Sequence, residues 1–204
     1  MDKHKLYGLW HRFKNSSIIL IIVMFVVFAA ASVYELRANN LQMVKLRQAV
    51  YATDEQNGDV EAALKNLREY VYGHMNTNLR SNSSSSEPPI QLAGRFNRAL
   101  SAEQARVAAL GGANQVYVDA QRECEVSSLP LTARAQCMQN YITANGNGVP
   151  QLNLPPKEAY TFDFLSPFWS PDLAGWSIVL ASIIGLLLLA RLIAGFMVAR
   201  FIKN

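Results

Sequence analysis

The sequence predicts an all-α protein in which two transmembrane helices flank an exported helical bundle. Two uncharged apolar runs, Ser16–Tyr34 and Leu173–Ala190, lie near the two ends of the 204-residue chain. Basic residues gather outside these runs, and the long segment between them lacks the alternating pattern of β-strands. The mean hydropathy of +0.07 is high for a soluble domain and too low for a multispanning protein, and the two apolar runs exclude a simple soluble enzyme and a polytopic channel.

Each apolar run is long enough to cross a bilayer. At 1.5 Å per residue, 18 or 19 helical residues extend roughly 27–28 Å, close to the ~30 Å hydrocarbon core. We therefore predict spans at 16–34 and 173–190. For the first run, a cleaved signal peptide is the alternative, because Ala29-Ala30-Ala31 offers an A-x-A site. The length of the run and the unbroken helical pattern after Ser32 favour an uncleaved span.

The placement of charge predicts the orientation in the membrane. Segment 35–172 has 12 basic and 14 acidic residues, whereas both tails, 1–15 and 191–204, are basic. Basic residues beside spans stay on the cytoplasmic side, so both termini are expected in the cytoplasm and the middle outside it. The residues that determine this topology are Lys3, Lys5, Arg12 and Lys14 in the first tail and Arg191, Arg200 and Lys203 in the second.

Segment 35–80 is predicted to form a helical hairpin. Apolar residues in its first half follow a heptad-like spacing, and Asn57-Gly58-Asp59 ends that helix. We expect Gly58 to adopt the left-handed conformation and Asp59 to cap the next helix. The apolar positions are Leu36, Met43, Leu46 and Val50 in the first helix and Val60, Leu64, Leu67 and Val71 in the second.

A Ser/Pro linker at 81–89 precedes a second helical segment at 90–144. Gly111-Gly112 predicts a break in this segment, and a capping box at Ser101 and Gln104 predicts an alternative break. A shorter helix is expected over 131–143, after a turn at 127–130. The core candidates are Leu92, Phe96, Leu100, Val107, Leu110 and Tyr117.

Segment 145–172 is a predicted return loop that ends in a cluster of aromatic residues. Aromatic rings prefer the headgroup region, so we expect Phe164, Phe168, Trp169 and Trp176 at the membrane interface; a ligand-binding aromatic patch is the alternative. In the second span, Ser177, Ala181 and Gly185 recur every four residues. This spacing predicts helix packing, against the first span or another copy, unless it reflects ordinary membrane-helix composition.

The chemistry-bearing residues predict no catalytic site. Cys124 and Cys137 are the only cysteines and predict a disulfide, with two free thiols as the alternative. His74 beside a Met could indicate copper, but a surface histidine is favoured because no second ligand pair follows. The carboxylates Asp54, Glu55, Asp59 and Glu61 are expected in a solvated turn. With no catalytic or nucleotide-binding motif, we expect neither enzyme activity nor a metal or cofactor.

The layout resembles bacterial two-span sensors of the chemoreceptor type, in which an exported helical bundle lies between the spans. The resemblance covers Leu36–Met75 and implies a helical hairpin in an exported domain. No signalling domain follows the second span, so an interaction or envelope-assembly function is favoured. A ligand-sensing ectodomain that relays to a partner protein is the alternative. The expected partners are the lipid bilayer and another protein or copy, through the spans and exported helices; no basic, aromatic-rich patch predicts nucleic-acid binding.

Overall fold

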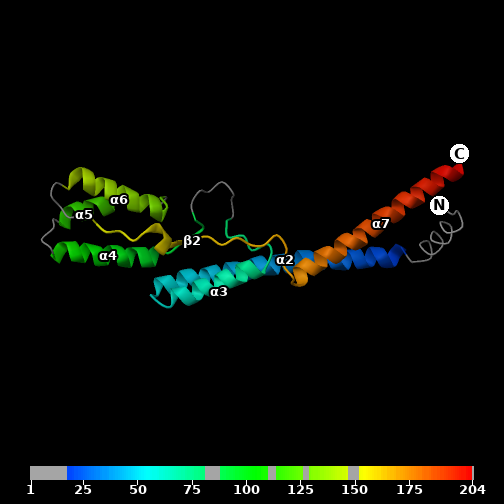
Figure 1. Ribbon diagram of the computed structural model, residues 1–204, viewed down its shortest axis with the longest axis horizontal. Coiled ribbons are helices and arrows are strands. Elements are labelled where there is room, and N and C mark those ends of the chain that lie inside the picture. Colours follow the sequence, from blue (N-terminus) through cyan, green and yellow to red (C-terminus); the bar gives the residue numbers. More distant parts are fainter. Residues whose placement is uncertain (1–17, 81–87, 110–113, 126–128, 147–151, 204) are drawn as a thin grey trace. The chain divides into compact units, whose positions relative to one another are not determined.

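The computed structural model describes residues 18–80, 88–109, 114–125, 129–146 and 152–203, and these are mostly helical (Figure 1). This agrees with the predicted all-α class. The elements in chain order are α2 (Ile18–Glu55), α3 (Val60–Gly73), β1 (Ile90–Gln91), α4 (Ala93–Ala109), α5 (Asn114–Cys124), α6 (Leu131–Asn145), the short 3-10 helix η1 (Lys157–Ala159), β2 (Thr161–Phe162) and α7 (Leu173–Lys203).

The chain divides into two compact units. Unit 1 comprises residues 1–41, 73–77 and 166–204, and unit 2 comprises residues 42–72 and 78–165. Helix α2 contributes its first part to unit 1 and its last part to unit 2.

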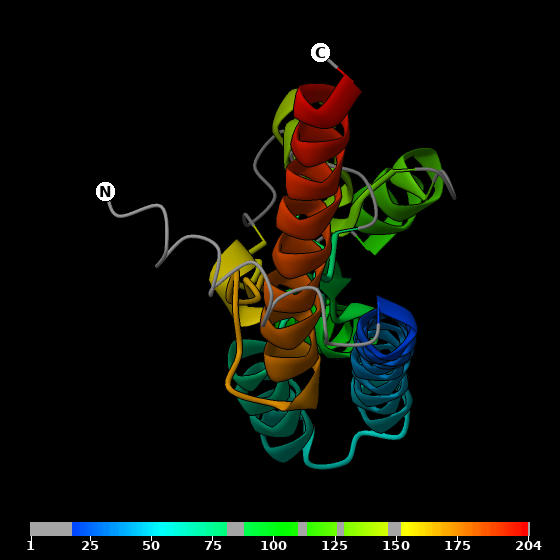
Figure 2. The same ribbon diagram turned by 90° about the vertical axis from the view of Figure 1, so that its right-hand side faces the viewer.

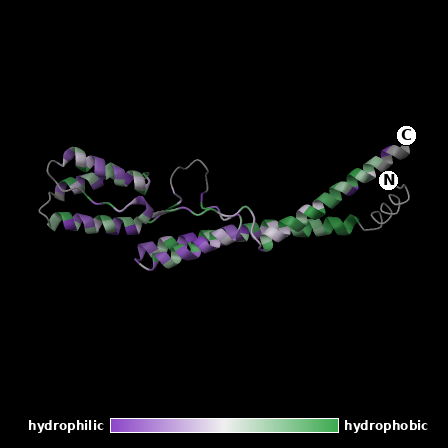
Figure 3. Ribbon diagram, viewed as in Figure 1, coloured by the Kyte–Doolittle hydropathy of each residue, from purple (hydrophilic) through white to green (hydrophobic). Residues whose placement is uncertain are grey.

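Unit 1 contains two helices that are long and apolar enough to cross a membrane. They are α2 and the part of α7 between Leu173 and Met197, and Figure 3 shows the first part of α2 and most of α7 as hydrophobic. Large apolar side chains on both remain exposed, such as Ile19 (69%) and Leu186 (66%). Helix α7 continues beyond Ala190, where the sequence predicted the end of the second span.

In unit 2, the last part of α2 and helix α3 form the predicted hairpin. Asn57, with φ of 55°, takes the left-handed conformation at the turn, not Gly58 as expected. Asn can adopt this conformation because its short polar side chain bonds locally. Asp59 caps α3 as predicted, since its Oδ1 accepts the Ala62 N–H at 3.0 Å. The buried residues of this hairpin are Met43, Val50, Val60, Leu64, Leu67 and Val71.

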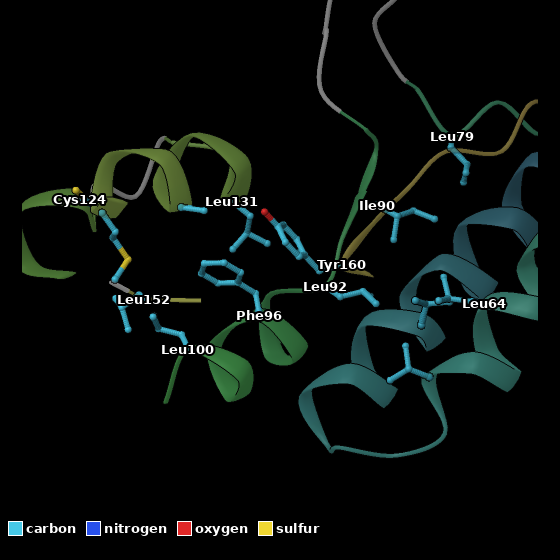
Figure 4. Packing of buried hydrophobic residues seen from close by; sticks show 14 of the residues in the cluster. Leu64, Leu79, Ile90, Leu92, Phe96, Leu100, Cys124, Leu131, Leu152 and Tyr160 are labelled. Carbon is cyan, nitrogen blue, oxygen red and sulfur yellow. The ribbon is translucent and has the colours of Figure 1, made fainter. Parts of the chain in front are cut away.

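Helices α4, α5 and α6 of unit 2 extend the same cluster of buried apolar side chains beyond the hairpin (Figure 4). The Phe96 and Tyr160 rings lie 5.1 Å apart at its centre. Helix α4 is unbroken at Ser101, whose hydroxyl donates to the Asn97 carbonyl at 2.9 Å, so the alternative break there is wrong. Helix α4 ends at Ala109, and helix α5 begins at Asn114. The predicted break at Gly111-Gly112 and the core candidate Leu110 lie outside the described residues.

A two-stranded antiparallel sheet interrupts the helical pattern of unit 2. Ile90 lies opposite Phe162, and Gln91 opposite Thr161. Two-residue strands are too short to show alternation, which is why the sequence did not predict them. The sheet also positions a helix cap: Gln91 Oε1 accepts the Leu131 N–H at 2.9 Å and so satisfies a backbone donor of the first turn of α6.

Asp54 differs most from expectation, because it is buried and not a solvated turn residue. Its carboxylate accepts the backbone N–H groups of Gly94 at 2.8 Å and Arg95 at 2.7 Å. Arg98 donates to the same carboxylate at 2.9 Å and to the Asp54 carbonyl at 2.7 Å. The last turn of α2 thereby caps α4 and satisfies its first amides. A Cβ at Gly94 would lie 2.7 Å from the Asp54 carbonyl oxygen, so this approach requires glycine.

Glu103 joins α4 to the return segment. It pairs with Arg106 at 2.7 Å and 2.8 Å and accepts the Asn153 N–H at 2.6 Å. The hydrogen bonds from Arg106 and Asn153 lower the pKa of Glu103 to about 2. The carboxylate of Glu103 therefore remains ionised, and holds both partners, down to acid pH.

The predicted disulfide is confirmed. Cys124, at the end of α5, bonds to Cys137 on α6, with their Cα atoms 5.8 Å apart. The pair joins the two arms of a helical hairpin, and Cys124 is fully buried.

The disulfide should be detectable as a difference between the intact masses of the full chain before and after reduction. Intact protein should be about 2 Da lighter before reduction than after it, because closing the bond removes two hydrogens. Replacing both cysteines by Ala should lower the free energy of unfolding by about 3 kcal/mol, through the less restricted unfolded chain. Two thiols that react with an alkylating reagent in the native protein would contradict the bridge.

Asp54→Ala should lower the free energy of unfolding by about 2–4 kcal/mol, because it leaves two helix amides and the Arg98 guanidinium without their acceptor. Gly94→Ala should also destabilise, by forcing α2 and α4 apart. Denaturant unfolding of the full chain in detergent micelles measures both effects. The matched control is Glu69→Ala, which removes an exposed carboxylate 3.8 Å from Lys65 and should cost less than about 0.5 kcal/mol. Equal losses in the Asp54 and Glu69 variants would refute the capping function.

Glu103 should make the stability of unit 2 dependent on acid pH. Its folded pKa is depressed, so its contribution is fully present above the unfolded pKa of about 4.3 and is lost as pH falls toward about 2. Glu103→Gln should remove this part of the pH dependence in acid unfolding of the full chain. Glu69→Gln serves as a control, and an unchanged acid profile in the Glu103 variant would count against the assignment.

Candidate functional site: a polar clamp between the apolar helices

The polar residues of unit 1 gather where α7 begins, beside α2 and the turn at 73–77. Asp172 starts α7, because its Oδ1 accepts the Gly175 N–H at 2.9 Å. An aspartate at this position satisfies an amide of the first turn and complements the positive end of the helix. A Cβ at Gly175 would overlap the Ser170 carbonyl oxygen, so the tight entry into α7 depends on glycine. We name Asn39, Asn40, Met75, Asn76, Ser170 and Asp172 the polar clamp.

Asn39 is the centre of the polar clamp and is buried, with 7% of its surface exposed. Its amide donates to Asp172 Oδ2 at 3.0 Å and, more weakly, to the Met75 carbonyl at 3.4 Å. Ser170 joins the entry of α7 to the turn, because its hydroxyl oxygen accepts the Met75 N–H at 3.0 Å. Three separate segments, α2, the turn at 73–77 and the entry to α7, are therefore joined through polar groups.

A second set of bonds ties the turn to α2. Asn76, with φ of 60°, donates its side-chain amide to the Leu36 carbonyl at 2.9 Å. In return, Asn40 donates to the Asn76 carbonyl at 3.3 Å. The buried Thr77 hydroxyl donates to the His74 carbonyl at 2.7 Å. The turn and α2 thus each donate a side-chain amide to a backbone carbonyl of the other.

The clamp favours the ionised form of Asp172. Burial alone would raise its pKa, but hydrogen bonds from the Gly175 amide, Asn39 and Ser170 outweigh it, and the nearby His74 adds a smaller effect. The pKa of Asp172 is therefore below its ordinary value. The stabilisation from this carboxylate is complete above the unfolded pKa of about 3.9 and is lost as pH falls through the lowered one.

The predicted interface aromatics separate into two groups. Trp169 and Trp176 in unit 1 pack edge to face, 5.8 Å apart, and both rings are partly exposed. Phe168 is 99% exposed. Phe164 differs from the expectation, since it is buried in unit 2 against Tyr72 and Phe162, at 6.2 Å and 6.5 Å. Phe164 therefore belongs to a core and has no exposed ring to place at an interface.

One of the small residues of α7, Gly185, lies against α2 within unit 1. Ser177 is buried and its hydroxyl donates to the Leu173 carbonyl. An added Cβ at Gly185 would lie 3.1 Å from the ring of Phe25 on α2. Ala181 lies between them at helical spacing and is half-buried. Gly185 thus packs against the first apolar helix, while packing of this stripe against another copy stays a prediction.

The remaining residues that the sequence singled out do not gather into a site within the described part of the chain. Arg191 is half-buried and Arg200 exposed on α7, while the side chain of Lys203 and residues Lys3, Lys5, Arg12 and Lys14 lie outside the described residues. His74 is half-buried beside the clamp. Within the described part of the chain, no three His, Cys, Asp or Glu side chains come close enough to hold a metal ion.

The polar clamp was not predicted from the sequence, although two signals pointed to it. Adjacent Asn residues at 39 and 40 are poor helix formers in the middle of a long helix, which suggests a specific contact. Ser170-Pro171-Asp172 immediately before an apolar run is typical of a helix start. Neither signal names a partner, because the bonded residues lie far apart in sequence.

Asn39→Ala should loosen the clamp by leaving Asp172 and the Met75 carbonyl without their buried donor, at a cost of about 1–3 kcal/mol. Hydrogen exchange of the full chain should then be faster by about tenfold or more in peptides covering 170–176, at the start of α7. Asn40→Ala is the matched control, because it gains the same helix propensity but removes only an exposed bond. Equal exchange in the two variants would show that Asn39 does not hold these segments together.

The chain matches no family model, no curated protein and no solved structure. The function of the polar clamp is therefore inferred from its own residues.

Proposed function

We propose that this chain is a non-enzymatic two-span membrane protein, whose unit 2 is exported and mediates protein interaction in assembly of the cell envelope. The observation that carries the proposal is the pairing of two long apolar helices by the polar clamp. Their outer faces keep large apolar side chains exposed, such as Val26 (56%) and Leu189 (54%). A bilayer would cover these faces, since spans of this length match the hydrocarbon core.

The distribution of side chains along α7 supports the orientation. Trp169 and Trp176 lie at the clamp end, where aromatic rings would occupy the outer headgroup region. Arg200 lies toward the opposite end of the same helix, as expected on the cytoplasmic side. In this placement the polar clamp lies at the exported surface and joins both spans to the turn after α3.

Two features of unit 2 favour an exported interaction domain. The Cys124–Cys137 disulfide is typical of an oxidising compartment. Two cavities lined by described residues, one beside Ile142 and Leu152 and one beside Tyr117, measure about 230 and 280 Å³. Each is smaller than the roughly 300–1,000 Å³ typical of ligand pockets, so neither cavity by itself favours ligand sensing.

Topology mapping tests the membrane part of the proposal. The full chain should resist carbonate extraction, and an impermeant maleimide should label Lys65→Cys in intact cells. Asn204→Cys should be labelled only after lysis, and intact mass should retain Met1. Labelling of both reporters in intact cells, release by carbonate, or a mature start at Ser32 would overturn the two-span topology.

Crosslinking tests the interaction part. Photo-crosslinkers at exposed unit 2 positions, such as Val118 (47% exposed), should capture one protein partner reproducibly in intact membranes. The matched control is a crosslinker at Leu186 (66% exposed), which lies on the apolar part of α7 and should capture lipid. Recovery of lipid alone from Val118 would count against the interaction function, and thermal stabilisation by a small molecule would favour sensing.

A further inference from the structure

A cavity of about 230 Å³ lies in unit 2, between the C-terminal half of α6 and the return segment. The described residues that line it are Gln139, Asn140, Ile142 and Thr143 on α6 and Leu152 on the return segment. The return segment runs from Leu152 to η1 and is drawn in yellow in Figures 1 and 2. The helix caps and ion pairs of unit 2 described above use none of these side chains.

The cavity has an apolar floor and a polar rim. Ile142 and Leu152 form the floor and are buried, with 4% and 5% of their surfaces exposed. Gln139, Asn140 and Thr143 form the rim and are exposed, and their spacing of three and four residues places them on one side of α6. An occupant would therefore meet apolar carbon on one side and amide and hydroxyl groups around its edge.

The rim offers both donors and acceptors to a ligand. The Thr143 hydroxyl donates to the Gln139 carbonyl at 2.8 Å, which leaves its oxygen as an acceptor. The side-chain amides of Gln139 and Asn140 can each donate two hydrogen bonds and accept others at the oxygen. The described lining contains no charged side chain. A charged ligand would find no opposite charge there, so the cavity suits a neutral ligand that is rich in hydroxyl or amide groups.

Bonds to other elements hold both walls of the cavity in place. On α6, the disulfide joins Cys137, two residues before Gln139, to α5. On the return segment, the backbone N–H of Asn153, next to Leu152, donates to Glu103 of α4 at 2.6 Å. A site whose walls are fixed before binding loses less conformational entropy when the ligand arrives.

We infer that this cavity binds one ring of a neutral saccharide, supplied by a glycan of the cell envelope. A pyranose ring has an apolar C–H face that matches the floor and hydroxyl groups at its edge that match the rim. An apolar side chain of a protein partner would instead bury the rim groups without hydrogen-bond partners. The small volume fits this assignment, because the usual range for pockets applies to larger, drug-sized ligands.

This inference goes beyond protein interaction, since binding a structural glycan would anchor unit 2 in the envelope. The envelope as the source of the saccharide rests on the proposed export of unit 2. The geometry of the cavity itself does not depend on that export, so the two can be tested separately.

Calorimetric titration of the full chain tests the site, in a detergent without a sugar headgroup and with three neutral probes: chitotriose, cellotriose and maltotriose. At least one should bind, and Gln139→Ala or Asn140→Ala should raise its Kd by about fivefold or more, because each removes hydrogen bonds from the rim. Gln48→Ala is the matched control, since it removes an exposed amide on α2 that does not line the cavity, and it should change the Kd by less than about twofold. Glycerol should not displace the saccharide, because it has hydroxyl groups but no ring face.

Binding of none of the three probes, or equal losses in Asn140→Ala and Gln48→Ala, would overturn the saccharide site. A photo-crosslinker at Gln136, an exposed neighbour of the rim, tests for a protein occupant in intact membranes. Capture of a protein there even in excess trisaccharide would overturn the site as well. Each variant should keep the wild-type disulfide mass and thermal midpoint, which establishes that it folds.

The topology reporters separate this inference from the proposed function. Labelling of Lys65→Cys only after lysis would overturn the export of unit 2 and the envelope glycan as the source of the saccharide. Protein with the expected topology that binds no saccharide would overturn the saccharide site alone.

Discussion

The hydrogen bond from Asn39 to Asp172 is the interaction on which unit 1 depends. It joins the middle of α2, beyond its apolar part, to the start of α7 and so fixes the relative height of the two helices. The contact of Gly185 with Phe25 follows from that height. The Asp172 carboxylate also caps α7, so one side chain begins the helix and anchors it to α2. Movement of α7 against α2 would break the bond between Asp172 and Asn39.

In unit 2, too, side chains from distant segments cap the starts of helices. The buried carboxylate of Asp54 caps α4, and the amide of Gln91 caps α6. Short helices are marginal by themselves, and most of their stability comes from tertiary contacts. An acceptor supplied from a distant segment makes the start of each helix conditional on the packing of the whole unit. The disulfide between α5 and α6 adds a covalent constraint to the same group of helices.

The proposed membrane setting gives the polar clamp its physical importance. Apolar helices in lipid gain no hydrophobic free energy by associating, because the lipid tails are as apolar as the side chains. Close backbone approach at small residues and polar bonds between helices must then hold them together. Gly185 against Phe25 supplies the first, and the polar clamp supplies the second.

Features that depend on neighbouring residues were predictable from the sequence. Apolar length predicted the two long helices, helical spacing predicted the buried stripe of α3, and two cysteines flanking a turn predicted the disulfide. Features made by residues far apart in the chain became visible in the fold alone. Asn39 and Asp172 are 133 positions apart, and Asp54 and Gly94 are 40 apart. The burial of Asp54 and Phe164 also depends on residues far apart in the chain, and so does the pairing of the two-residue strands. Local periodicity carries no information about such pairs, because whether a polar side chain meets water or a buried partner is fixed when distant segments pack.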